Sequence, residues 1–89
     1  QRLVKVDERR KRDVLTRILD KDEGMTTIIF CNRKTTVRDL AKSLKRDRFR
    51  AGEIHGDMDQ PSRIAELERF KAGDINILVA SDVAARGLD

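Results

Sequence analysis

Short apolar runs alternate with amphipathic segments along this 89-residue chain, and that alternation most strongly restricts its fold. Apolar runs fall near residues 3–6, 26–31, 51–54 and 75–80, each the length of one strand. Between them, apolar residues recur at helical spacing over about 7–21, 37–44 and 59–73. Strands that alternate with helices across short loops predict an α/β fold, in which helices flank a parallel sheet on right-handed crossovers.

Local signals predict where the helices end and which faces they bury. Gly24 ends the first helix, and the third begins at Asp59 as N-cap, with Pro61 in its first turn, and stops at Gly73. The residues expected to face the core are Val37, Leu40, Ala41 and Leu44 in the second helix, and Ile64, Leu67 and Phe70 in the third.

Composition narrows the classes of function. A single cysteine excludes an internal disulfide and favours a reducing, cytoplasmic setting, and no apolar run approaches the length of about eighteen residues that a membrane span needs. The sequence contains no cluster with metal-ligand spacing. The net charge of +4 favours an anionic partner, while three scattered phenylalanines are too few for a base-stacking platform. Any nucleic acid would therefore be held by its phosphates.

The second apolar run ends in Asn32, Arg33 and Lys34, at the start of a helix. Backbone N–H groups and the helix dipole there favour an anion, and the two cations reinforce them. A plain solvated turn is the alternative for this segment. Cys31 raises a second alternative, a rhodanese- or phosphatase-like nucleophile, but Val37 and Thr36 stand where such loops require arginine. We interpret Cys31 as a small buried hydrophobic residue.

The third apolar run ends in His55, Gly56 and Asp57, and a helix begins shortly afterwards with Gln60 and Arg63. Residues three apart share a helix face, so the amide and the guanidinium can together hold a phosphate. The alternative is a surface ion pair between Arg63 and Asp59 or Glu66. A lone histidine is interpreted as structural.

The fourth apolar run leads into Ser81 and Asp82, followed by Arg86, Gly87 and Asp89. Ser81 and Asp82 can accept backbone N–H bonds at the start of a helical turn, while the last three residues offer a ligand one cation and one carboxylate. All these turns lie at carboxyl ends of strands, where open α/β sheets bind ligands. A line of donors along one sheet edge could follow a nucleic-acid backbone without reading its bases.

The segments IIFCNRK, IHGDMDQPSR and LVASDVAARGLD, in this order, resemble motifs IV, IVa and V of the second RecA-like domain of DEAD-box RNA helicases. The resemblance implies a RecA-like three-layer fold with a parallel sheet. It also implies two sets of functional residues. The expected RNA-binding residues are Asn32, Arg33, Gly56, Gln60, Arg63 and Ser81, and the expected ATP-binding and interdomain residues are Arg86, Gly87 and Asp89.

The sequence lacks other helicase elements: a phosphate loop, an Asp-Glu-Ala-Asp stretch and the arginines of motif VI. We therefore expect residues 1–89 to be a helicase C-terminal domain that is incomplete at its C-terminal end, truncated after motif V and inactive alone. ATP is the expected cofactor, with Mg²⁺ held by an absent N-terminal RecA-like domain. Expected partners are RNA and that domain, and the truncated sheet is expected to self-associate. The alternative is a non-enzymatic module that binds RNA or protein.

Overall fold

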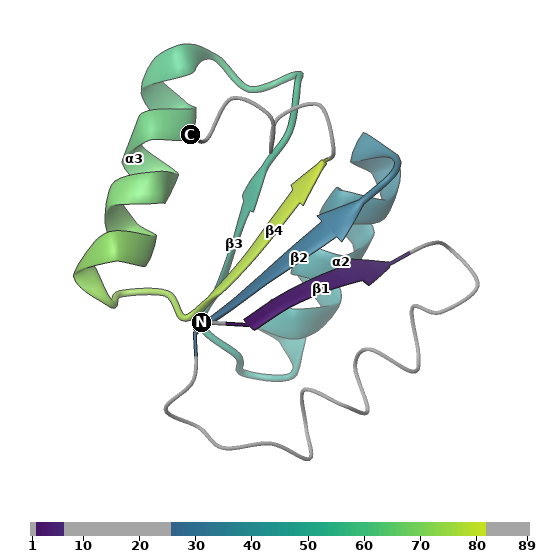
Figure 1. Ribbon diagram of the computed structural model, residues 1–89, viewed down its shortest axis with the longest axis horizontal. Coiled ribbons are helices and arrows are strands. Elements are labelled where there is room, and N and C mark those ends of the chain that lie inside the picture. Colours follow the sequence, from purple (N-terminus) through teal and green to yellow (C-terminus); the bar gives the residue numbers. More distant parts are fainter. Residues whose placement is uncertain (1, 7–25, 82–89) are drawn as a thin grey trace.

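The computed structural model describes residues 2–6 and 26–81 of the chain. The elements within these residues are β1 (Arg2–Val6), β2 (Thr27–Cys31), α2 (Lys34–Arg46), β3 (Ala51–Ile54), α3 (Gln60–Ala72) and β4 (Ile77–Ser81) (Figure 1). The helix expected over about 7–21, with its end at Gly24, lies outside the described residues.

The four described strands form one parallel sheet in the order β1-β2-β4-β3. The last strand in sequence, β4, is therefore inserted between β2 and β3, where every one of its residues is buried. Its central residue Val79 pairs with Ile29 of β2 on one side and with Glu53 of β3 on the other. The predicted parallel α/β sheet is confirmed, and the carboxyl ends of β2, β4 and β3 lie side by side.

The sheet separates two apolar clusters, as a three-layer arrangement requires. Successive strand residues point to opposite faces, so Ile29 belongs to the cluster beneath α2 while Ile28 packs with the cluster beneath α3. Figure 1 shows α2 and α3 on different sides of the sheet. The α2 cluster also contains Val37, Leu40, Ala41, Leu44 and Val79, and the α3 cluster contains Ile54, Ile75, Leu78 and Ala80.

The two helices differ in how deeply they are buried. Helix α2 buries Val37, Leu40, Ala41 and Leu44, as predicted. Helix α3 has no fully buried residue: Leu67 and Phe70 pack partly buried against the sheet. The expectation that Ile64 is buried is wrong, since half of this residue is exposed (50%).

The side chain of Glu66 accounts for the exposure of Ile64. Its Oε2 atom accepts a hydrogen bond from the backbone N–H of Glu53 in β3 at 3.0 Å, so Glu66 faces the sheet. The helical repeat then turns Ile64 away from the sheet. Gly52 permits this approach, because a Cβ atom there would come within 2.4 Å of Ile75 Cδ1 and 2.8 Å of Glu66 Oε2.

The ends of α3 match the sequence signals. Asp59 is the N-cap, and its Oδ1 atom accepts the N–H of Ser62 at 2.8 Å; Gly73 caps the other end with a φ of 85°. Strand β4 begins at Ile77, two residues later than predicted. The N–H groups of Asp74 and Ile75 instead donate to the carbonyl of Arg69 and complete the helix end.

Candidate functional site

The sheet order brings three strand-end turns to one edge of the molecule. Ser81, the last residue of β4, pairs in register with Cys31 of β2, and Ala80 pairs with Ile54 of β3. Asn32 and Arg33 follow β2, and Gly56 follows β3, so they flank the end of β4 on either side. We call the six predicted RNA-binding residues at this edge the strand-end surface: Asn32, Arg33, Gly56, Gln60, Arg63 and Ser81.

The start of α2 can receive an anion. Arg33 is the N-cap in extended geometry (φ −128°, ψ 143°) and provides no side-chain cap, and the first turn contains no acidic residue. The positive end of the helix dipole is therefore not compensated by a carboxylate within that turn. Asn32 and Arg33 are both exposed beside it, whereas Ser81 is nearly buried at the end of β4.

The start of α3 presents Gln60 and Arg63, which are exposed and half-buried respectively. The alternative ion pairs of Arg63 are not formed within residues 2–6 and 26–81. Asp59 accepts the N–H of Ser62, and Oε1 of Glu66 contacts Nη1 of Arg69 at 2.6 Å. Hydrogen bonds from the side chain and the backbone of Ser62 lower the pKa of Asp59. Both carboxylates are thus engaged elsewhere, which leaves the Arg63 guanidinium available to a ligand.

Within the described part of the chain, no steric contact requires glycine at position 56. A Cβ atom built on it would meet nothing within 4 Å, and its φ is not positive. Glycine in such a turn is typical where another molecule must approach the backbone closely.

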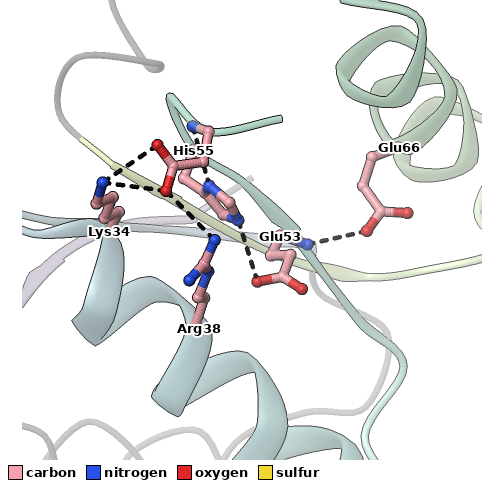
Figure 2. Close-up of polar contacts among 6 residues, drawn as sticks. Lys34, Arg38, Glu53, His55 and Glu66 are labelled. Atoms are coloured by element: carbon pink, nitrogen blue, oxygen red, sulfur yellow. Dashed lines mark hydrogen bonds and ion pairs between the residues drawn. The ribbon is translucent and has the colours of Figure 1, made fainter. Parts of the chain in front are cut away.

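An ion-pair network, which the sequence did not reveal, holds the turn that contains Gly56 (Figure 2). Asp57 Oδ2 lies 3.0 Å from Lys34 Nζ and 3.3 Å from Arg38 Nη2 on the first turns of α2. The hydrogen bond from Lys34, opposed by partial desolvation and supported by the charges of Lys34 and Arg38, holds the pKa of Asp57 below 3.8. The sequence shows only that Lys34 and Arg38 are four residues apart and therefore share one face of a helix. This spacing does not predict which carboxylate they contact.

His55 lies beneath this turn and is buried. Its Nδ1 atom accepts the backbone N–H of Asp57 at 3.3 Å, and its Nε2 atom lies 3.7 Å from Glu53 Oε2. These contacts support the structural interpretation of His55 and add a partner carboxylate.

Cys31 is fully buried in the cluster beneath α2, as expected of a small hydrophobic residue. Neighbouring Thr36 and Val37 are buried as well. No arginine stands at either position that a cysteine-nucleophile loop would need, so the geometry gives that alternative no support.

Three of the predicted residues, Arg86, Gly87 and Asp89, lie outside the described residues. Within the described part of the chain, no group of three His, Cys, Asp or Glu side chains could hold a metal ion. Neither α2 nor α3 is long and apolar enough to cross a membrane.

Residues 10–89 match the family model described as helicase conserved C-terminal domain. The chain is 45% identical over 89 residues to the DEAD-box ATP-dependent RNA helicase CshA of Streptococcus pneumoniae and 46% identical over 86 residues to that of Bacillus subtilis. These alignments cover 100% and 97% of the chain, which spans 17% of the length of each relative.

Two solved structures share the fold. A DEAD-box protein from Methanococcus jannaschii superposes with a TM-score of 0.79 at 38% identity, over 100% of this chain and 24% of that one. The Escherichia coli DEAD-box protein SrmB, solved bound to the regulator RraA, superposes with a TM-score of 0.78 at 32% identity, over 100% and 53% respectively. The chain therefore belongs to the DEAD-box RNA helicase family, as part of its C-terminal RecA-like domain.

Proposed function

We propose that this chain is the RNA-backbone-binding and ATP-cleft-completing half of an ATP-dependent DEAD-box RNA helicase that works in the cytoplasm. The observation that carries the proposal is the strand-end surface, where a helix start without an acidic residue in its first turn, the Gly56 turn and the Arg63 side chain lie along one sheet edge. Among residues 2–6 and 26–81, a Cβ atom on Gly56 would meet nothing within 4 Å, and Arg63 pairs with neither Asp59 nor Glu66. The names of the curated relatives describe ATP-dependent RNA helicases and support the same reading.

RNA is bound through successive phosphates along this edge. The N–H groups at the start of α2 and the side chains of Asn32 and Arg33 hold one phosphate, and the backbone of Gly56 admits the next at close range. Gln60 and Arg63 grip a phosphate with amide and guanidinium donors, and Ser81 adds a hydroxyl at the end of β4. Contacts to phosphates carry no sequence information, so binding through them is independent of RNA sequence.

ATP binds between this half and an N-terminal RecA-like domain. Arg86 and Asp89, with Gly87 between them, contribute the wall of the cleft on this side, where a guanidinium can bind phosphate and a carboxylate can accept a ribose hydroxyl. The donor set of this chain fits such a wall but not the metal: its sequence contains no phosphate loop. We therefore assign Mg²⁺ to the other domain, and we expect the chain alone not to hydrolyse ATP.

The proposal is tested by Arg63→Ala in the full-length protein that contains this chain. We expect the RNA concentration for half-maximal ATPase stimulation to rise about tenfold, the loss typical of one charged hydrogen-bonding group. Lys71→Ala is the matched control, because it removes an exposed cation from the other end of the same helix.

Equal RNA titrations for the two variants would contradict the role of Arg63. RNA binding by the wild-type protein without any ATP turnover would contradict the helicase assignment and favour the non-enzymatic module.

A further inference from the structure

The carboxylate of Asp57 joins the turn after β3 to the helix that follows β2. Lys34 Nζ lies within 3.1 Å of both carboxylate oxygens, and Arg38 donates to Oδ2 at 3.3 Å. These cations come from a segment 23 and 19 residues away in the sequence. The contact therefore spans two strand-end turns that the strand order alone leaves unconnected.

Two hydrogen bonds to His55 hold the backbone of the same turn. The Asp57 N–H donates to His55 Nδ1, and the Met58 N–H donates to the His55 carbonyl at 3.2 Å. His55 itself is buried at the end of β3. Both the main chain and the side chain of Asp57 thus make contacts within the protein, and Gly56 lies between Asp57 and the buried His55.

We propose that Asp57 is a positioning residue, whose bridge to Lys34 and Arg38 holds the backbone of Gly56 and the start of α2 as one rigid phosphate-binding platform. This inference rests on the proposed function and adds a residue that makes no contact with RNA. Two phosphate sites on separate turns bind one backbone well only if their separation matches that of the phosphates, because otherwise binding must also order the turns.

An opposite role for Asp57 makes an opposite prediction. A carboxylate held between two cations occupies the position of a phosphate, so it could compete with RNA for Lys34 and Arg38. Removing its charge would then strengthen RNA binding, as the added net positive charge would do by itself. Positioning is the reading that the contacts favour, since the backbone N–H of Asp57 is hydrogen-bonded to His55 in addition to the ion pairs of its side chain.

The test uses Asp57→Asn in the full-length protein, with fluorescence anisotropy of a labelled single-stranded RNA at several salt concentrations. We expect RNA affinity to fall about threefold to tenfold, although the loss of a negative charge would by itself strengthen RNA binding. The slope of log affinity against log salt concentration should stay unchanged, because no phosphate contact is removed. Asp74→Asn is the matched control: it removes an exposed carboxylate before β4, at the opposite end of the sheet, and should not weaken binding.

A double-mutant cycle with Lys34→Gln separates positioning from general charge effects. If Asp57 acts through Lys34, the double variant binds RNA no more weakly than Lys34→Gln alone; additive losses would overturn the proposal. Tighter binding by Asp57→Asn would also overturn it and assign the carboxylate as a competitor. Affinity equal to that of Asp74→Asn would show that the bridge has no role.

A second measurement keeps the inference distinct from the proposed function. If the wild-type protein fails to bind RNA, the proposed function fails, but amide hydrogen exchange of residues 55–58 still reports on the bridge. We expect this exchange to be faster in Asp57→Asn than in Asp74→Asn, by more than the difference in their global stability accounts for. Unchanged exchange would overturn the proposal even in a protein that binds RNA.

Discussion

Gly56 and Gly73 show how the same residue type serves different purposes in this chain. Gly73 ends α3 with a φ of 85°, a conformation that disfavours any side chain, whereas Gly56 has open space around it and no positive φ. The fold therefore favours glycine at position 73, whereas no contact within the described residues requires glycine at position 56, which is the position we propose for close approach of an RNA phosphate.

Gly56→Ala should leave stability nearly unchanged and weaken RNA binding, because the new methyl group would stand between the backbone and a phosphate. Gly73→Ala should do the reverse, lowering the free energy of unfolding by about 1 kcal/mol with RNA affinity retained. Denaturant titration and RNA anisotropy on both variants check this. Retained RNA affinity in a stable Gly56→Ala protein would remove Gly56 from the binding surface.

The ionisation of Asp57 also makes the free energy of unfolding depend on pH. Its pKa in the folded chain is lowered below 3.8 by the hydrogen bond and charge of Lys34, so the folded state favours the ionised carboxylate. The stabilisation is fully present above about 3.8, the unfolded value, and is lost as the pH falls through the lower folded pKa.

The stability difference between wild type and Asp57→Asn should therefore be present near neutral pH and shrink at acidic pH. Denaturant unfolding of both proteins across this range measures it. Comparison with the variant is necessary because Asp59, whose pKa is also lowered, contributes the same trend to both proteins. A difference that grew on acidification would contradict the bridge.

At the scale of elements, Glu66 joins α3 to the edge of the sheet. Strand β3 is an outer strand of the sheet formed by the described residues, and its Glu53 N–H donates to Glu66 Oε2. Such side-chain pairing satisfies a backbone donor that would otherwise be exposed on the edge. The Glu66 side chain is 12% exposed, so the interaction is well shielded from water.

Glu66→Ala should lower the free energy of unfolding by about 1–2 kcal/mol, because the Glu53 N–H loses its acceptor. Glu66→Gln keeps a carbonyl oxygen that can accept this bond and should cost less. Denaturant unfolding measures both losses, and exchange of the Glu53 amide locates them. Equal losses in the two variants would show that the charge pair with Arg69 matters more than the hydrogen bond.

The elements themselves were largely predictable, because their signals are local. Asp59 and Gly73 cap α3 as expected, and the spacing of Val37, Leu40 and Leu44 identified the buried face of α2. The predictions were wrong where tertiary contacts determine which residues form a strand or face the sheet. Ile75 is buried without belonging to β4, and Ile64 is exposed because Glu66 takes the sheet-facing position.

At the scale of the whole molecule, the composition favours binding to phosphates over stacking on bases. The chain carries 20 Lys and Arg against 16 Asp and Glu, with only three aromatic residues. Binding to single-stranded RNA should therefore weaken as salt rises, with a log–log slope of about −0.7 for each phosphate neutralised. Salt-independent binding would indicate a protein partner or base stacking instead.

Self-association of the sheet stays a prediction. Strand β1 is the other outer strand of the described sheet, and its Leu3 is largely exposed. Sedimentation at several concentrations tests it, and a monomer throughout would remove this expectation.

The sequence by itself determined the α/β alternation, the helix caps and the helicase family, since periodicity, capping and motif residues are properties of short segments. It also predicted that Asn32, Gly56 and Ser81 lie at one edge of the sheet, because parallel strands must gather their carboxyl ends there. Only the tertiary structure decided that β4 lies between β2 and β3, which makes their two turns neighbours across Ser81. Only it paired Asp57 with Lys34 and Arg38, since ion pairing across 19 to 23 residues depends on how the helices pack and no local pattern encodes it.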